Sequence, residues 1–210
     1  MLENREVPLQ IDVPVRRERL HGREVTIACV ADAGANREAR PVGANPFGFA
    51  NTASLATVAL SLGGAVSESE LVSLGLSRGL CSRSDDTPLS GGVSQEDLLR
   101  LLSECRAPGR SERGYSLEDL AQSVESGSRV IAFVNAGELW DRSDEPSLSE
   151  ANCAVVIEGV ARDALSQEIC GFLLRDPTAP ATPVFVDALR TGRMWLDAGG
   201  WQIVPAQPSL

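Results

Sequence analysis

The sequence predicts an α+β domain in which N-terminal helices pack on a C-terminal antiparallel sheet. Residues 51–125 carry apolar side chains at helical spacing. From residue 129 onward, short apolar runs typical of buried strands take their place. Helices first and strands afterwards is the order expected of an α+β fold, and no internal repeat interrupts it.

The composition is typical of a globular protein and argues against some classes of partner. With 210 residues, 43% of them hydrophobic and 23% charged, the chain can bury one sizeable core. A net charge of −10 argues against nucleic acid and anionic membranes as partners, and aromatic residues at 4% leave little surface for base stacking. We therefore expect neither nucleic-acid binding nor membrane insertion.

No apolar run approaches the length of a membrane span, and the N-terminus lacks the apolar core of a secretory signal. These features predict a cytoplasmic protein. Five widely spaced cysteines without a C-x-x-C pair disfavour a disulfide framework and a structural zinc site. We expect reduced, mostly buried thiols and neither a metal nor a cofactor; the cysteines are Cys29, Cys81, Cys105, Cys153 and Cys170.

The chain divides into an N-terminal extension, residues 1–43, and a main domain, residues 44–210. The extension is expected to pack on the domain and to contain one strand, residues 23–33, whose side chains alternate at Val25, Ile27 and Cys29. A loop rich in proline and glycine then leads to the first helix.

Four helices are predicted. The first spans residues 51–62, has its apolar residues on one face and ends at Gly63-Gly64. The other three begin at serines that have an acidic residue three positions later, which is an N-capping pattern. These serines are Ser67, Ser94 and Ser116, followed by Glu70, Asp97 and Asp119.

Five strands follow, and a long loop, residues 135–152, separates the first from the second. We expect Trp195 and Trp201 to close a C-terminal hairpin around the LDAGG stretch between them. The strands are predicted at 129–134, 154–160, 169–174, 184–186 and 201–204.

Three short strings carry a family resemblance. They are ANTASLA (50–56) at the first helix, CAVVIEGV (153–160) on a strand, and LLRDP (173–177) after the next strand. In this order they resemble the motifs of papain-like cysteine peptidases, closest to the bacterial double-glycine leader peptidases, over about residues 44–204. The resemblance implies a papain-like fold.

The family's catalytic residues are largely absent. A thiolate at a helix N-terminus, an imidazole that protonates the leaving amine and a carboxylate that orients the ring are needed for the chemistry. The corresponding positions hold Ala50, Cys153 and Asp176. The oxyanion amide would fall at Ala44, one residue from Asn45. The resemblance thus implies a domain that has lost the peptidase triad.

The cleft between the first helix and the sheet is expected to persist. Its helix N-terminus would favour an anion or a carbonyl oxygen. Cys153 is either an inert strand-start thiol, or a relocated nucleophile or ligand contact across the cleft from Asn51. Asp176 either belongs to the cleft or only begins a turn. The sole histidine, His21, lies far upstream and is not expected to be catalytic. The expected lining is Asn45, Phe49, Ala50, Asn51, Trp140, Cys153 and Asp176.

Two functions remain open. The chain is either a catalytically degenerate protein that binds a peptide or a natural-product intermediate without proteolysis, or a repurposed biosynthetic enzyme such as a cyclase or an acyl- or peptide-modifying enzyme. Neither is a conventional cysteine peptidase. The sequence does not distinguish between these two hypotheses, and it does not indicate an oligomeric state.

Overall fold

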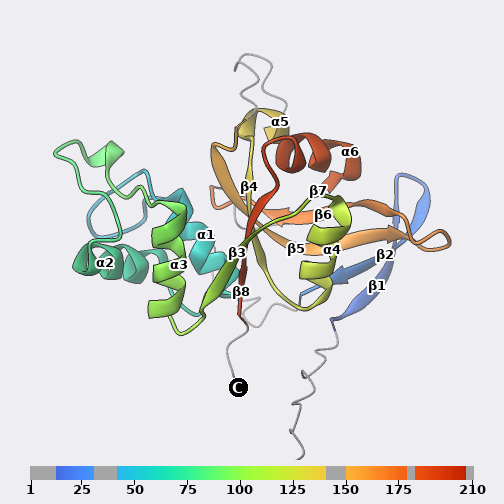
Figure 1. Cartoon of the computed structure of the whole chain (residues 1–210), viewed down its shortest axis with the longest axis horizontal. Helices are drawn as coiled ribbons and strands as arrows, with labels where there is room; N and C mark the ends of the chain where they lie inside the picture. The colour runs from blue at the N-terminus through green and yellow to red at the C-terminus, as the bar shows by residue number, and fades with distance from the viewer. Residues whose placement is uncertain (1–12, 31–41, 141–149, 179–182, 207–210) are drawn as a thin grey trace, which may run out of the picture.

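The computed structural model of the chain describes residues 13–30, 42–140, 150–178 and 183–206. Its described strands form one antiparallel sheet in the order β1-β2-β5-β4-β8-β3, and β6 and β7 extend from the other edge of β5 (Figure 1). This arrangement confirms the α+β class. The strands are β1 (Val15–Leu20), β2 (Arg23–Cys29), β3 (Gly109–Arg113), β4 (Val130–Val134), β5 (Cys153–Asp163), β6 (Ile169–Arg175), β7 (Val184–Asp187) and β8 (Trp201–Pro205).

The helices gather in two places. Figure 1 shows α1 to α3 on one side of the sheet, and α4, α5 and α6 around the rest of it. No described helix is long and apolar enough to cross a membrane. The helical elements are α1 (Ala53–Ser61), α2 (Glu68–Arg78), η1 (Thr87–Leu89), α3 (Gln95–Glu104), α4 (Leu117–Glu125), α5 (Ala136–Trp140), α6 (Ala188–Thr191) and the π-helical turn η2 (Gly192–Leu196).

The sheet separates two apolar cores because its side chains alternate between the faces. On β4, Val130 and Ala132 face a core that also contains residues of α4 and β6, whereas Ile131 faces the core of α1, α2 and α3. The same alternation places Val155 of β5 in the first core and Ala154 in the second. We call the first, which contains residues of α4, the α4 core, and the second, which contains residues of α1, the α1 core.

The capped helices begin where the sequence predicts. Ser67, Ser94 and Ser116 are the N-caps of α2, α3 and α4, and each side chain accepts a hydrogen bond from the backbone N–H three residues later. At the end of α1, Gly63 and Gly64 adopt positive φ angles of 64° and 70°, which stop the helix.

Several elements are missing from the sequence-based prediction, namely the strands β1 and β3, the helices α5 and α6, and the short turns η1 and η2. Strands β1 and β3 lie at the two ends of the sheet order and carry mostly exposed polar residues, so no apolar alternation marks them. Helix α5 occupies the start of the stretch expected to be a loop. Within residues 1–43, the described part forms β1 and β2, and β2 pairs with β5 in the main sheet.

The expected C-terminal hairpin is wrong. Trp195 lies in the π-helical turn η2, and only Trp201 lies on a strand, β8. The two residues nevertheless meet, because the indole N–H of Trp195 donates to the carbonyl oxygen of Trp201 at 3.1 Å. Trp195 is fully buried in the α4 core, so packing rather than strand pairing places it.

Candidate functional site

The chain that leads into α1 is held by a carboxylate of α2. Glu68, at the first position of α2, is buried, with an exposed fraction of 9%. Its Oε1 accepts hydrogen bonds from the backbone N–H of Gly43 at 2.9 Å, the side-chain amide of Asn45 at 3.2 Å and the hydroxyl of Thr52 at 2.5 Å. One carboxylate oxygen therefore fixes both ends of the loop before α1.

Asn45 closes the same loop from within. Its Oδ1 accepts from the backbone N–H groups of Phe47 and Phe49, each at 3.2 Å, and its Nδ2 donates to the carbonyl oxygen of Phe49 at 2.9 Å. The amide group is thus engaged by its own loop and by Glu68. The neighbouring Ala44 is exposed, and its carbonyl oxygen accepts from the hydroxyl of Ser69 at 3.3 Å.

The positions at the start of α1 differ in exposure. Phe49 is buried in the α1 core and its ring stacks on Phe47, with 5.5 Å between centroids. Ala50 and Asn51 are exposed. Thr52 is the N-cap but gives no side-chain cap; its hydroxyl instead donates to Glu68 and accepts from the backbone N–H of Gly43 at 3.2 Å. The first N–H groups of α1 are thus left without a side-chain acceptor at the N-cap.

The loop between α2 and α3 packs against this start. A Cβ at Gly91 would lie 2.9 Å from the carbonyl oxygen of Asn51 and 2.6 Å from a side-chain carbon of Thr52, so the contact requires glycine. The side-chain amide nitrogen of Asn51 lies beside Gly92, 3.1 Å from where a Cβ would be. Residues 91 and 92 therefore border Asn51, the residue that follows Ala50.

Cys153 and Asp176 lie at the ends of two neighbouring strands. Cys153 is the first residue of β5, and Asp176 directly follows β6. Burial raises the pKa of the Cys153 thiol, and the charge of Asp176 raises it further. The thiol is therefore neutral at physiological pH and a poor nucleophile.

Asp176 itself is buried, with an exposed fraction of 5%, and begins a turn. Its Oδ1 accepts hydrogen bonds from the backbone N–H and the hydroxyl of Thr178, both at 2.7 Å. The preceding residue, Arg175, donates from Nε to the buried carboxylate of Glu158 at 2.8 Å. Two consecutive residues thus fix the end of β6: Arg175 through Glu158, and Asp176 through Thr178.

Helix α1 is fixed against the start of β5. The hydroxyl of Thr57 lies 3.1 Å from the carbonyl oxygen of Ala154, and Phe49 and Ala154 belong to the same α1 core. Cys153 and Trp140 border the α4 core instead. The structure thus brings Asn45 and Phe49 together before α1, and places Cys153, on the strand that α1 contacts, where the charge of Asp176 acts on its thiol.

His21 lies away from this region, whereas Glu68 belongs to it although the sequence does not indicate it. His21 is at the tip of the β1–β2 hairpin, with its ring 6.4 Å from that of Phe185. No role of Glu68 is evident from the sequence, because no local signal marks its contact with Gly43, 25 positions earlier in the chain. Among the described residues, no group of three or more His, Cys, Asp or Glu side chains could hold a metal ion.

No protein-family model matches the chain, and no curated protein sequence matches it. Solved structures do. One is described as a C39-like peptidase from Bacillus anthracis, with a TM-score of 0.51 and 18% identity over 82% of this chain and 96% of that one. Another is a double glycine motif protease from an AMS/PCAT transporter in complex with its leader peptide, with a TM-score of 0.43 and 15% identity over 75% and 86% of the chains. The chain therefore has a fold similar to that of a C39-like peptidase.

Proposed function

We propose that the chain is a catalytically degenerate cysteine-peptidase-like protein that binds a peptide or a natural-product intermediate at the N-terminal end of α1 without cutting it. The observation that carries the proposal is the exposure of Ala50 at the position that the resemblance assigns to the nucleophile. A methyl group cannot attack a carbonyl, yet the position is open to a ligand.

The electrostatics support binding rather than covalent chemistry. The raised pKa of Cys153 keeps its thiol protonated, and Asp176 has no imidazole to orient. At the start of α1, backbone N–H groups that lack a side-chain cap favour a carbonyl oxygen or a carboxylate of a ligand. A peptide backbone offers such oxygens along its whole length.

The test measures binding and product together. Synthetic leader-type peptides that carry a Gly-Gly or Gly-Ala pair are titrated calorimetrically into the protein, and the mixture is then analysed by mass spectrometry. We expect heat of binding and an unchanged peptide mass. Two fragments that disappear with Cys153→Ser would overturn the proposal in favour of a relocated nucleophile. Loss of water from the peptide would favour the alternative, a repurposed cyclase.

A matched pair of substitutions locates the ligand. Ala50→Trp fills the exposed position at the N-terminal end of α1, whereas Ala65→Trp adds the same side chain at an exposed position beyond its C-terminal end. We expect Ala50→Trp to abolish binding and Ala65→Trp to leave it unchanged. Equal affinities for both variants would place the ligand elsewhere.

A further inference from the structure

Strand β1 lies at one edge of the sheet, and no other strand that the structure describes pairs with its outer side. It ends the strand order and, among the described strands, it pairs only with β2, from Val15 opposite Ala28 to Leu20 opposite Arg23. Figure 1 shows β1 and β2 at the lower right, away from α1. An open edge presents a row of backbone donors and acceptors to any extended chain that approaches it.

The direction of these backbone groups follows from one hydrogen bond. The N–H of Cys29 donates to the carbonyl oxygen of Pro14 at 3.1 Å. Positions along an antiparallel pair alternate between bonded and non-bonded, so Arg16, Glu18 and Leu20 face β2. The backbone N–H and C=O groups of Val15, Arg17 and Arg19 therefore point to the outer edge.

The same edge is basic although the protein is acidic. Residues 16–24 hold four arginines and two glutamates, which gives this segment a net charge of +2. Since the whole chain has a net charge of −10, the remaining residues together carry −12. Glu18 is already paired with Arg16, at 2.8 Å. Among the residues that the structure describes, the exposed Arg17 has no ion-pair partner, and the side chain of Arg19 bonds only the carbonyl oxygen of Gly22.

We propose that the β1 edge binds an acidic peptide segment as an added strand, with two carboxylates at alternate positions beside Arg17 and Arg19. Arg17 and Arg19 lie two positions apart, so their side chains share one face, and both have outward backbone groups. Backbone hydrogen bonds hold the segment, and the charges select it. This site is independent of the proposed ligand site at α1.

Other occupants fit less well. A second copy of β1 would bring two edges of net positive charge together, which disfavours pairing between copies. A nucleic acid or an anionic bilayer extends far beyond one strand and would meet the acidic remainder of the surface. A short acidic strand meets only the basic edge.

The test uses a fluorescent peptide of about eight residues in which glutamate and threonine alternate. We expect saturable binding by anisotropy that weakens with added salt, and slower hydrogen exchange at the outward amides of Arg17 and Arg19. Arg17→Glu combined with Arg19→Glu should weaken binding about tenfold or more. The matched control, Arg78→Glu with Arg100→Glu on the exposed faces of α2 and α3, should leave it unchanged.

A second variant separates strand addition from simple charge attraction. Arg17→Pro removes one outward N–H while the bonds to β2 at neighbouring positions remain, so binding should fall although the protein stays folded. Unchanged binding by Arg17→Pro, equal binding of a lysine–threonine peptide, or equal loss in the control variant would each overturn the proposal. Capture of phosphatidylserine vesicles or single-stranded DNA in place of the peptide would also overturn it.

Discussion

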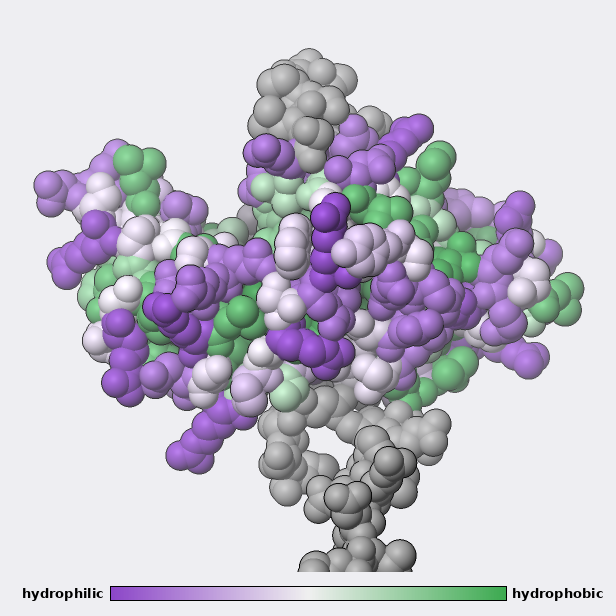
Figure 2. Space-filling view, in the orientation of Figure 1, coloured by the Kyte–Doolittle hydropathy of each residue, from purple (hydrophilic) through white to green (hydrophobic). Residues whose placement is uncertain are grey.

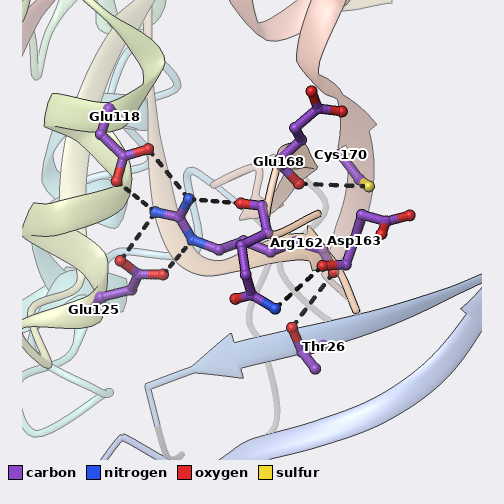
Figure 3. A network of polar contacts seen from close by, with 8 residues as sticks. Thr26, Glu118, Glu125, Arg162, Asp163, Glu168 and Cys170 are labelled. Atoms are coloured by element: carbon purple, nitrogen blue, oxygen red, sulfur yellow. Dashed lines mark hydrogen bonds and ion pairs between the residues drawn. The ribbon is translucent and has the colours of Figure 1, made fainter. Parts of the chain in front are cut away.

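The guanidinium of Arg162 binds the carboxylate of Glu125 in a two-point contact, with Nε 2.7 Å from Oε1 and Nη2 3.1 Å from Oε2 (Figure 3). The same group reaches Glu118 at the other end of α4, at 2.6 Å. Glu125 lies in the last turn of α4, where the helix dipole disfavours a negative charge. Arg162 therefore compensates an unfavourable carboxylate and ties α4 to β5.

We expect Arg162→Ala to lower the free energy of unfolding by about 2 kcal/mol, because it leaves Glu125 without its partner in a half-buried setting. Arg162→Lys should recover only part of this loss, since an ammonium group lacks the planar fork. Urea denaturation measures both. Arg100→Ala, which breaks exposed pairs within α3, is the control and should cost at most about 0.5 kcal/mol.

Glu68 offers a second stability test. Glu68→Ala removes the acceptor shared by Gly43, Asn45 and Thr52, and we expect a loss of about 2–3 kcal/mol in urea denaturation. Glu68→Gln should lose less, because its carbonyl oxygen still accepts. Hydrogen exchange should become faster at the Gly43 amide in both variants. A Glu68→Ala protein as stable as the parent would mean that water replaces the carboxylate without cost.

These contacts show which parts of the molecule a sequence can predict. A serine N-cap and its acidic partner three residues later are in contact by local geometry, so Ser67 and Ser116 locate α2 and α4 from sequence alone. Buried strands such as β4 are equally visible, because burial on both faces requires a run of apolar residues.

The missed elements lack such local signals. β1 reads VRRERL and β3 reads GRSER, and both are fixed mainly by backbone pairing at the edges of the sheet. The contact between Glu68 and the loop before α1 depends on how two distant segments pack. Figure 2 shows apolar and polar residues mixed over the face that it draws.

Asp119 should make the free energy of unfolding depend on pH in the acidic range. The backbone N–H of Tyr115, 2.7 Å from its carboxylate, and the groups of Ser116 lower the pKa of Asp119. A lowered pKa in the folded state means that the stabilisation is present above the unfolded value of about 3.9 and is lost as the pH falls through the folded value. Asp119→Asn should therefore destabilise the protein at pH 7 more than near pH 2, where the carboxyl group is protonated in the folded and unfolded states.

Thermal unfolding from pH 7 to pH 2 measures this difference. Asp85→Asn, in the exposed loop before η1, is the matched control and should run parallel to the parent protein at every pH. A cost of Asp119→Asn that stays constant over the whole range would show that the carboxylate charge contributes nothing to the cap.

The thiol of Cys153 should be unreactive. Burial and the charge of Asp176 raise its pKa, so at neutral pH it should react with iodoacetamide no faster than free glutathione does. Asp176→Asn removes one cause of the raised pKa and should increase the rate. Mass-resolved labelling compares Cys153 with the other four cysteines, and modification of Cys153 far ahead of them would favour a covalent mechanism.

The last prediction rebuilds a catalytic pair on this scaffold. In the double variant Ala50→Cys, Cys153→His, the new thiol lies at the N-terminal end of α1 and the new imidazole lies beside Asp176. The helix N-terminus and a protonated imidazole both stabilise a thiolate. We expect the thiol at position 50 to titrate at least about one unit below the usual value of ~8.5. The pH dependence of its alkylation rate measures this pKa.

Two controls separate the contributions. Ala50→Cys, Cys153→Ala keeps the helix N-terminus without the imidazole, and Ala65→Cys, Cys153→His places the thiol beyond the other end of α1. The first should show a smaller lowering of the thiol pKa, and the second should show none. Proteolysis need not return, because Ala44 supplies no oxyanion amide and the side chain of Asn45 is engaged within its own loop. If the double variant and the Ala50→Cys, Cys153→Ala control titrate alike, positions 50 and 153 do not form a pair, and the assignment of the former nucleophile to Ala50 fails.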